Sequence, residues 1–247
     1  MQKFNSAGVE IAYEIWGQGS PVLLIHGFAS NVFVNWRDTG WVKTLVDAGH
    51  QVIGIDNRGH GESEKLYESN LYSAPLMAED AKRLLDHLKI AQADVMGYSM
   101  GARITAFLTM AHPTRVRRAV FAGLASRMIT GVGGSEDIAL ALEAETLATV
   151  ADKGARMFRV FADSTKSDRR ALAACIRSSR VKIKAEALAM ITVPVLVVAG
   201  EQDDVAGNVG ELVNTIPGSR GVELPGRNHM NAVGDLGFKN AVVEFLK

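Results

Sequence analysis

The chain has 247 residues, 47% of them hydrophobic, and its 27 Lys and Arg residues equal its 27 Asp and Glu residues in number. This balance gives no sign of binding to nucleic acid or to an anionic membrane surface, and no apolar stretch is long enough to span a bilayer. The hydrophobic fraction is enough for a globular core, and the only cysteine, Cys175, has no partner for a disulfide, which fits a reducing compartment. We expect a cytoplasmic protein that is a monomer or a homodimer.

The amino-terminal part of the chain alternates apolar runs with loops rich in small residues. Residues 4–15 alternate in hydrophobicity about a turn, which predicts a hairpin. Residues 22–25 and 51–56 are largely apolar, as is typical of strands buried on both faces of a parallel sheet. The loops at 26–31 and 57–63 follow these strands. Because open α/β sheets bind ligands at the carboxyl ends of their strands, we expect a site where these loops meet.

Strands and helices then alternate through the middle of the chain. Helices are predicted near residues 41–48, from 74 to 88 and from 102 to 111, where apolar residues recur at helical spacing. Strands are predicted at residues 95–98 and 118–123. This alternation predicts a doubly wound, mostly parallel sheet with right-handed connections.

The strand pattern stops between residues 126 and 189, where helix-forming composition replaces it. We therefore predict an inserted helical cap at 126–189, between two parts of an α/β core at 1–125 and 190–247. Residues 152–184 carry ten Lys or Arg against three Asp. Two interpretations stay open: the charges lie on solvated faces of amphipathic helices, or they form a funnel for anionic substrates.

The last part of the chain returns to the earlier alternation. Strands are predicted at residues 195–200 and 222–224, and helices at 209–216 and 238–246. Carboxylates follow the first of these strands and His229 follows the second. These side chains should therefore lie at the same sheet edge as the amino-terminal loops.

The strand at residues 95–98 runs into Gly-x-Ser-x-Gly and then into a helix. This order is typical of a nucleophile elbow, in which small neighbours allow a strained serine to project into a cleft. A serine hydroxyl is a poor nucleophile unless a base lies beside it, and a histidine base needs a carboxylate to fix its tautomer. Ser99, Asp203 and His229 follow three different strands in the order expected for this architecture, so the fold can bring them together.

The chain resembles the α/β-hydrolase superfamily over essentially its whole length. The resemblance rests on His26-Gly27-Phe28, Asp56 to Ser63, Gly97 to Gly101, Gly200 to Asp203, and Gly226 to His229. It implies an α/β-hydrolase fold with Ser99 as nucleophile, His229 as general base and then acid, and Asp203 as the carboxylate that orients the histidine. It also implies that the backbone amides of Phe28 and Met100 form an oxyanion hole.

Three details of the resemblance bear on the chemistry. Asp203 rather than its neighbour Asp204 matches the family's spacing after Gly200, so Asp203 is the predicted partner of the histidine. A serine at the elbow argues against the family's haloalkane dehalogenases and epoxide hydrolases, which carry aspartate there. Ala206 departs from the family's pattern, in which proline often follows the acid.

Candidate substrate contacts come from the predicted cap and from the neighbours of the acid and base. They are Met128, Met157, Phe158, Phe161, Val205 and Met230. The cap residues would line a lipophilic pocket, although packing within the cap explains them equally well.

The remaining histidines and charged motif residues are expected to be structural. His26, Asp56, Arg58 and His60 should brace their loops by hydrogen bonding, because the triad is already filled. No pair of histidines has metal-ligand spacing, so we expect no metal and no cofactor.

The sequence therefore predicts a serine hydrolase that cleaves a small carboxylic ester, thioester or lactone through an acyl-serine intermediate. The same triad also serves carbon–carbon bond hydrolases and perhydrolases, and fold alone does not separate these reactions. A receptor that binds a small ligand and retains the triad is a further alternative.

Overall fold

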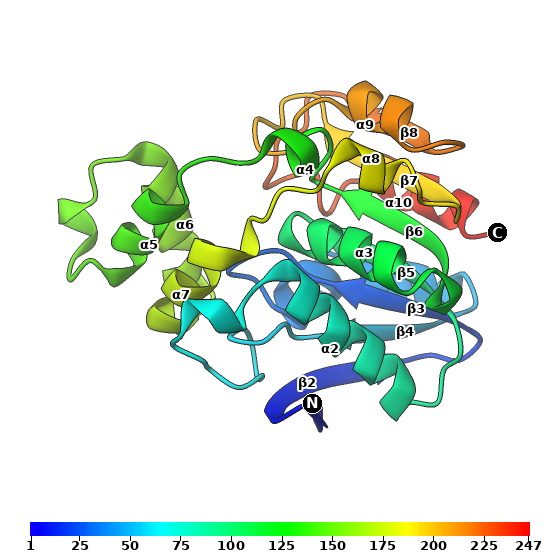
Figure 1. The fold of residues 1–247 in the computed structure, drawn as a ribbon, viewed down its shortest axis with the longest axis horizontal. Coiled ribbons are helices and arrows are strands. Elements are labelled where there is room, and N and C mark those ends of the chain that lie inside the picture. The colour runs from blue at the N-terminus through cyan, green and yellow to red at the C-terminus, as the bar shows by residue number, and fades with distance from the viewer.

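An eight-stranded sheet forms the centre of the protein, which is described by a computed structural model of residues 1–247 (Figure 1). The strands are β1 (Gln2–Ser6), β2 (Val9–Trp16), β3 (Ser20–Ile25), β4 (His50–Ile55), β5 (Ala93–Tyr98), β6 (Val116–Ala122), β7 (Val195–Gly200) and β8 (Arg220–Leu224). They lie in the order β1-β2-β4-β3-β5-β6-β7-β8. The β1-β2 and β2-β4 pairs are antiparallel and the other pairs are parallel, so the predicted mostly parallel sheet is confirmed.

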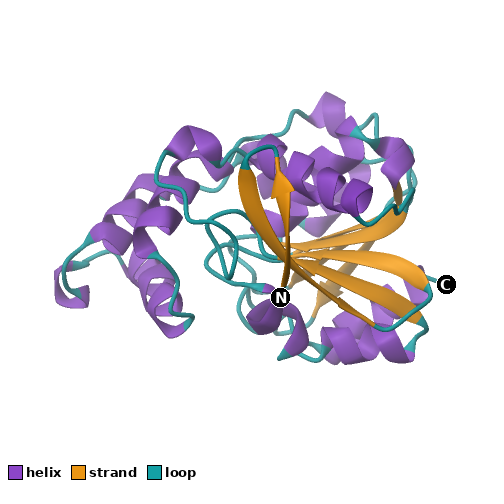
Figure 2. Ribbon diagram, turned by 90° about the horizontal axis from the view of Figure 1, so that it is seen from below, coloured by secondary structure: helices purple, strands orange, loops and turns teal.

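Helices cover both faces of the sheet, as Figure 2 shows from below. They are α1 (Trp41–Asp47), α2 (Ala74–His87), α3 (Met100–Ala111), α9 (Val209–Thr215) and α10 (Leu236–Phe245). Alternate strand residues point to opposite faces. Val22 and Leu24 therefore pack in one cluster with residues of α1 and α10, while Leu23 and Ile25 pack in the other with residues of α2, α3 and α9. Burial on both faces explains the unbroken apolar runs in the sequence.

Between β6 and β7 the chain forms a series of helices. They are α4 (Arg127–Thr130), α5 (Ser135–Glu143), α6 (Lys153–Ser164), α7 (Arg169–Ser179) and α8 (Ala185–Leu188). Helices α5, α6 and α7 project from one end of the sheet, at the left of Figure 1. Side-chain caps from Asp152 and Asp168 begin α6 and α7. We call residues 126–189 the helical segment.

The two ends of the helical segment are tied together beside the core. The amide of Ile183 donates to the carbonyl of Met128 at 2.9 Å. Arg103 of α3 donates to the carbonyls of Met128 at 3.3 Å and Val181 at 2.5 Å. The segment therefore leaves and rejoins the core at one neck.

Several element boundaries differ from the predicted ones. The last helix begins at Leu236 rather than residue 238, because the Asp235 side chain accepts from the amides of Gly237 and Phe238 and caps it there. Short helical turns that the sequence analysis did not predict are η1 (Phe33–Arg37), η2 (Ser69–Leu71), η3 (Pro113–Arg115) and η4 (Leu147–Thr149). No helix combines the length and the apolar character that a bilayer crossing requires.

Candidate active site

Ser99 stands at a sharp turn between β5 and α3. Its φ of 55° lies in the left-handed region, which non-glycine residues seldom adopt. The two flanking glycines have no room for a side chain: a Cβ on Gly97 would overlap the backbone of Gly101, and a Cβ on Gly101 would overlap the carbonyl of Ile25. The Gly-x-Ser-x-Gly pattern is therefore a packing requirement of this turn.

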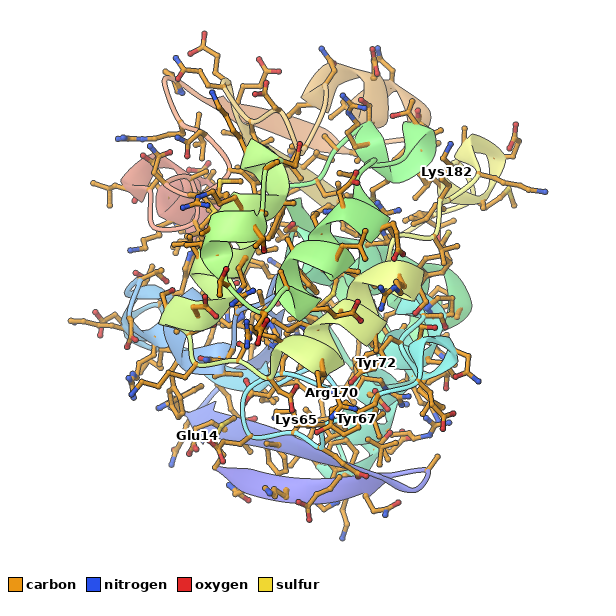
Figure 3. All side chains as sticks on the ribbon, turned by 90° about the vertical axis from the view of Figure 1, so that its left-hand side faces the viewer. Glu14, Lys65, Tyr67, Tyr72, Arg170 and Lys182 are labelled. Atoms are coloured by element: carbon orange, nitrogen blue, oxygen red, sulfur yellow. The ribbon has the colours of Figure 1, made fainter.

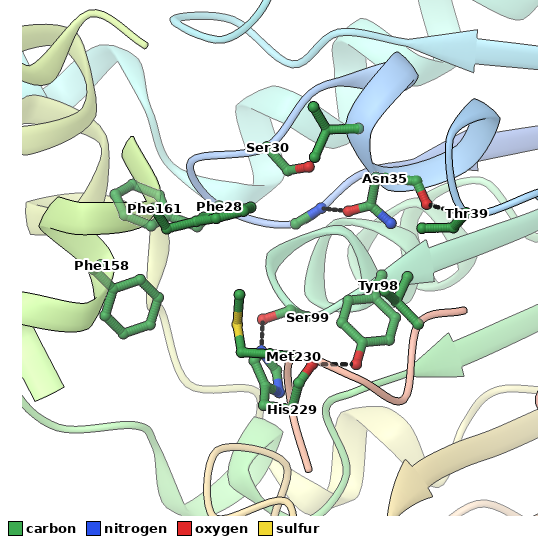
Figure 4. A pocket seen from close by; sticks show the side chains of 13 residues that line it. Phe28, Ser30, Asn35, Thr39, Tyr98, Ser99, Phe158, Phe161, His229 and Met230 are labelled. Atoms are coloured by element: carbon green, nitrogen blue, oxygen red, sulfur yellow. Dashed lines mark hydrogen bonds between the residues drawn. The ribbon is translucent and has the colours of Figure 1, made fainter. Parts of the chain in front are cut away.

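The serine hydroxyl, an imidazole and a carboxylate form a continuous hydrogen-bonded series, of which Figure 4 shows the contact between Ser99 and His229. Nε2 of His229 lies 3.0 Å from Oγ of Ser99, and its Nδ1 lies 2.8 and 3.0 Å from the two carboxylate oxygens of Asp203. Because a carboxylate only accepts, Nδ1 carries the proton and Nε2 is left free to accept from the serine hydroxyl. Asp204 is exposed and has no part in this series.

The Asp203 carboxylate is held by backbone amides as well as by the histidine. Its side chain is fully buried, and Oδ1 accepts from the amides of Val205 at 3.0 Å and Ala206 at 2.9 Å. Proline has no N–H, so the departure from the family's pattern at Ala206 supplies a donor that proline would lack. These amides fix the direction of the carboxylate toward the imidazole.

The loops that carry Asp203 and His229 interlock. The amide of Gln202 donates to the carbonyl of Arg227 at 2.9 Å, and the amide of Gly226 donates to the Glu201 carboxylate at 2.8 Å. The Tyr98 hydroxyl, from the strand that ends at the serine, donates to the carbonyl of His229 at 2.6 Å. The carboxyl ends of β5, β7 and β8 are thus joined by direct hydrogen bonds beside Ser99.

Two backbone amides near the serine are unused within the protein. The amide of Gly27 donates to Oδ1 of Asn35 at 3.0 Å, whereas the amides of Phe28 and Met100 make no hydrogen bond. Phe28, Ser99 and Met100 line one cavity. Free amides beside a nucleophile are the donors that an oxyanion requires.

His26 braces the loop that carries Phe28. Its Nε2 accepts from the amide of Asn57 at 3.0 Å, so its Nδ1 carries the proton and donates to the carbonyl of Gly27 at 2.7 Å. Burial lowers the pKa of His26 to about 4, which keeps the ring neutral.

The other residues of the Asp56 to Ser63 motif also hold backbone in place. Asp56 accepts from the amides of Val32 and Glu62 at 2.8 Å, and Arg58 forms a buried ion pair with Asp80 at 2.7 Å. Burial lowers the pKa of His60 to about 3, and its Nδ1 donates to the carbonyl of Arg58 at 2.9 Å. None of these side chains reaches Ser99 by a hydrogen bond.

Two cavities meet at Ser99. The larger, about 240 Å³, we call the histidine-side cavity because it includes His229 (Figure 4). The smaller, about 30 Å³, we call the arginine-side cavity because it includes two arginines, Arg103 and Arg180. Phe28 and Phe158 line both.

Four of the six predicted substrate contacts line these cavities. Phe161 and Met230 line the histidine-side cavity, Val205 lines the arginine-side cavity, and Phe158 lines both. The structure places Met128 and Met157 elsewhere. Met128 is fully buried at the neck, where its carbonyl accepts from Arg103 and Ile183, and Met157 is 41% exposed on the outer side of α6.

The basic residues of the helical segment have mostly local roles. Arg159 pairs with Asp163 at 2.9 Å, and Arg177 pairs with Glu136 at 2.9 Å and Glu143 at 2.6 Å. Figure 3 shows Arg170 beside Tyr67, whose ring centre lies 4.8 Å from the guanidinium, and Lys182 at the outer edge. Of the ten basic residues at 152–184, only Arg180 lines either cavity. The solvated-face interpretation therefore fits most of them.

Several site residues were missed by the sequence analysis: Asn35, Tyr98, Arg103, Ser179 and Arg180. Arg103 carried a usable signal, because an arginine stands among the inward-facing apolar residues of α3. Asn35 lies in an unpredicted π-helical turn and Arg180 at the carboxyl end of α7, where sequence spacing gives no direction toward Ser99. No group of three or more His, Cys, Asp or Glu side chains is arranged to hold a metal ion.

Comparison with known proteins shows similarity in sequence and in structure. A sequence profile described as alpha/beta hydrolase fold matches residues 20–142. A non-heme chloroperoxidase from Kitasatospora aureofaciens is 40% identical over 114 residues, which are 46% of this chain and 40% of that protein. A 2-hydroxymuconate semialdehyde hydrolase from a Pseudomonas species is 35% identical over 122 residues, 49% of this chain and 42% of that protein. The match spans about two fifths of the length of these curated relatives.

The structural likeness extends further along the chain. A hydrolase from Pseudomonas aeruginosa superposes with a TM-score of 0.81 at 26% sequence identity, over 99% of this chain and 97% of that one. The similarity in fold therefore includes the residues beyond the profile match.

Proposed function

This chain belongs to the α/β-hydrolase superfamily, and we propose that it is a serine hydrolase that cleaves a small carboxylic ester, thioester or lactone through an acyl group on Ser99. The observation that carries the proposal is the continuous series from Ser99 through His229 to Asp203, with hydrogen-bond distances between 2.8 and 3.0 Å. A serine placed at a glycine-flanked turn beside an oriented base is the arrangement that nucleophilic catalysis needs.

Acylation begins when His229 accepts the hydroxyl proton through Nε2 and the serine oxygen attacks the substrate carbonyl. Negative charge develops on the carbonyl oxygen, and the free amides of Phe28 and Met100 stabilise it. The bond between the carbonyl carbon and the alcohol oxygen then breaks, and protonated His229 gives its proton to the departing alcohol. An acyl ester on Ser99 and a free alcohol result.

Deacylation uses the same base in the same position. His229 removes a proton from water, and the resulting nucleophile attacks the acyl carbon. The bond to the serine oxygen breaks, the proton returns to that oxygen, and a carboxylic acid leaves. Asp203 orients the imidazole in both halves and stabilises its charged form.

The histidine-side cavity supports a substrate of modest size. Its volume is about 240 Å³, and its walls combine aromatic rings from α6 with polar side chains from the loop after β3. Phe158 and Phe161 offer an apolar surface, while Ser30 and Thr39 offer hydroxyl groups. A short alcohol or lactone ring suits this space better than a long acyl chain.

Two related reactions share the proposed acyl-enzyme. A perhydrolase transfers the acyl group to hydrogen peroxide rather than water, and a carbon–carbon bond hydrolase forms it from a ketone. The curated relatives are named as a chloroperoxidase and a semialdehyde hydrolase, so both acceptor and bond type need a direct test.

A fluorophosphonate probe tests the proposal directly. The probe should attach to Ser99 in the wild-type protein, and mass spectrometry of the peptides locates the adduct. Wild-type protein should turn over short p-nitrophenyl esters many times, and Ser99→Ala should not. Labelling of another serine, or near-normal turnover by Ser99→Ala, would contradict the proposal.

The receptor alternative predicts a different result in the same assay. A receptor would complete at most one slow turnover while its melting temperature rose on ligand binding. Adding hydrogen peroxide to the assay separates a perhydrolase, which would form a peracid in preference to the free acid.

A further inference from the structure

The arginine-side cavity has two positively charged side chains and no negatively charged one. It is lined by Arg103 from α3 and by Arg180 at the end of α7, together with Ser99 and the neighbouring Met100. Arg103 is only 2% exposed. Neither guanidinium forms an ion pair with a carboxylate, although Arg103 donates to the backbone carbonyls of Arg127, Met128 and Val181.

This pair of charges is electrostatically unfavourable as it stands. Burial and the charge of Arg180 lower the pKa of Arg103 to about 10, and burial lowers the pKa of Arg180 to about 10. Desolvated charges are normally paired, because an unpaired one keeps its desolvation cost. An anion in the cavity would supply the missing partner.

The cavity also holds hydrogen-bonding groups without partners. Arg180 donates from Nη1 to the carbonyl of Gly133, which leaves its Nε and Nη2 without an acceptor in the protein. Ser179 lines the same cavity and is 1% exposed; its hydroxyl lies beside the Cys175 thiol and has no oxygen or nitrogen partner. Arg180 is only partly exposed and Ser179 is buried, so both side chains offer donors to a ligand in this cavity.

The size of the cavity limits that ligand to a small group. Its volume is about 30 Å³. One water molecule needs about 10–15 Å³ by the same measure, so a carboxylate fits and a bulky group does not. Guanidinium groups bind carboxylates through paired N–H donors, which matches the free Nε and Nη2 of Arg180.

The position of His229 decides which part of the substrate enters this cavity. His229 lines the histidine-side cavity and not the arginine-side cavity. Because His229 must protonate the departing alcohol, the alcohol lies on the histidine side. The acyl part is therefore left to the arginine side.

We propose that the arginine-side cavity binds a carboxylate carried on the acyl part of the substrate, through Arg180, Arg103 and Ser179. The natural substrate is then a monoester of a short dicarboxylic acid, or a lactone that bears a free carboxylate. This inference rests on the proposed function, since it assigns the acyl side of the same reaction.

A matched pair of substrates tests the inference. Monomethyl succinate and methyl succinamate have the same ester and nearly the same shape, but only the first carries a negative charge. Wild-type kcat/KM should be about ten- to a hundredfold higher for monomethyl succinate, because hydrogen bonds to charged groups contribute roughly that much. Equal values for the two esters would overturn the inference.

Arg180→Gln is the main variant, and Lys184→Gln is its control. Arg180→Gln should lower the ratio of the two kcat/KM values about tenfold or more, because it removes the charged donor from the cavity. Lys184 is exposed and its side chain caps no helix, so Lys184→Gln removes the same unit of charge without touching the cavity. Its ratio should stay within about twofold of the wild-type value. A ratio lowered equally by both variants would show a general charge effect and no carboxylate site.

Arg103→Lys provides a second variant, chosen because Arg103 also ties the neck of the helical segment. Lysine keeps the positive charge but lacks the paired N–H donors of the guanidinium group, and the protein should still fold. The ratio of the kcat/KM values for monomethyl succinate and methyl succinamate should therefore fall less than in Arg180→Gln.

Binding and neutral-ester assays separate failure of this inference from failure of the proposed function. Succinate binding, measured by titration calorimetry, should be detectable in the wild type and lost in Arg180→Gln even without any turnover. Hydrolysis of methyl acetate that disappears in Ser99→Ala would leave the proposed function standing if the succinate result were negative.

Discussion

The α/β core and the helical segment at residues 126–189 contribute to the site in different ways. The core supplies Ser99, Asp203, His229 and the two free amides. Its backbone fixes these groups: the glycines beside Ser99 have no room for a side chain, and two amides hold the Asp203 carboxylate. The helical segment supplies Phe158, Phe161, Ser179 and Arg180, all as side chains on the cavity walls.

The attachment of the helical segment differs from the packing of the core. Outside the neck, side chains make the polar contacts: Thr165 donates to the carbonyl of Ala29 at 3.0 Å, and Tyr67 donates to Asp168 at 3.0 Å. Changes at Ser99, Asp203 and His229 in the core should therefore alter the rate of bond cleavage. Changes at Phe158 and Arg180 in the helical segment should alter which molecule binds.

The largest effect should come from changes at Ser99 and His229. Ser99→Ala and His229→Ala should each lower kcat by about 10⁵- to 10⁶-fold, and the double variant should be hardly worse, because the two residues act as one unit. Steady-state kinetics with a p-nitrophenyl ester measures all three. Additive losses in the double variant would mean that the residues act separately.

The next effect concerns the choice between two adjacent carboxylates. Asp203→Asn should lower kcat by about 10⁴-fold, because the amide would hold the imidazole in the wrong tautomer. The kcat of Asp204→Asn should stay within about twofold of the wild-type value, since Asp204 is exposed. The opposite pattern would move the orienting role to Asp204.

Acid should destabilise the core through its buried histidines. The pKa of His26 is lowered to about 4 from 6.5, so the unfolded chain binds a proton that the folded chain does not as the pH falls through that window. The free energy of unfolding should therefore fall by about 3 kcal/mol between pH 6.5 and pH 4 from His26 alone.

Urea titrations at a series of pH values measure this loss, and His26→Gln is the matched variant. All six histidines lie outside residues 126–189, so the helical segment has no titrating group of this kind. The pH dependence of the variant should be shallower by up to about 1.4 kcal/mol per pH unit. Identical slopes would show that His26 is not held neutral.

Helix α6 offers a smaller test within the helical segment. Phe158→Ala should raise KM about tenfold for a neutral ester with kcat changed less, because the ring lines both cavities and contributes apolar contact. Met157→Ala removes the exposed neighbour and should change KM by less than about twofold. A large fall in kcat for Phe158→Ala would show that the helical segment also affects the rate of bond cleavage.

Salt should have the smallest effect. Raising ionic strength from about 0.01 to 0.15 M shortens the Debye length from roughly 30 to 8 Å, so kcat/KM for monomethyl succinate should fall about two- to threefold. Methyl succinamate is uncharged, so its kcat/KM should not change with ionic strength. If kcat/KM depended equally on salt for both esters, the basic residues of the helical segment would lie only on solvated faces and would not attract the substrate.

The sequence predicted the core site because local rules determine it. Buried strands require unbroken apolar runs, and the turn at Ser99 requires glycine at positions 97 and 101, so both leave a pattern in the residues. The choice of Asp203 over Asp204 rested instead on the spacing after Gly200 in the family that the chain resembles. The hydrogen bonds at Asp203 agree with it.

The cavity walls were harder to predict, because they depend on how the helical segment packs against the core. Met157 and Phe158 are adjacent and equally apolar, yet one faces outward and the other lines both cavities. Arg180 was one of ten similar charges in its region. Side-chain direction at the end of α7 comes from long-range packing, which single-sequence patterns do not contain.

The interlocked loops that carry Asp203 and His229 have a consequence for how this protein tolerates change. The acid and the base are 26 positions apart, yet the bonds from Gln202 to Arg227 and from Gly226 to Glu201 bind their loops into one unit. The intervening turn near Gly218 has open space around it and takes no part in that join. A reporter peptide inserted at that turn should leave the acid–base pair together, so this connection is a natural entry point for engineered insertions.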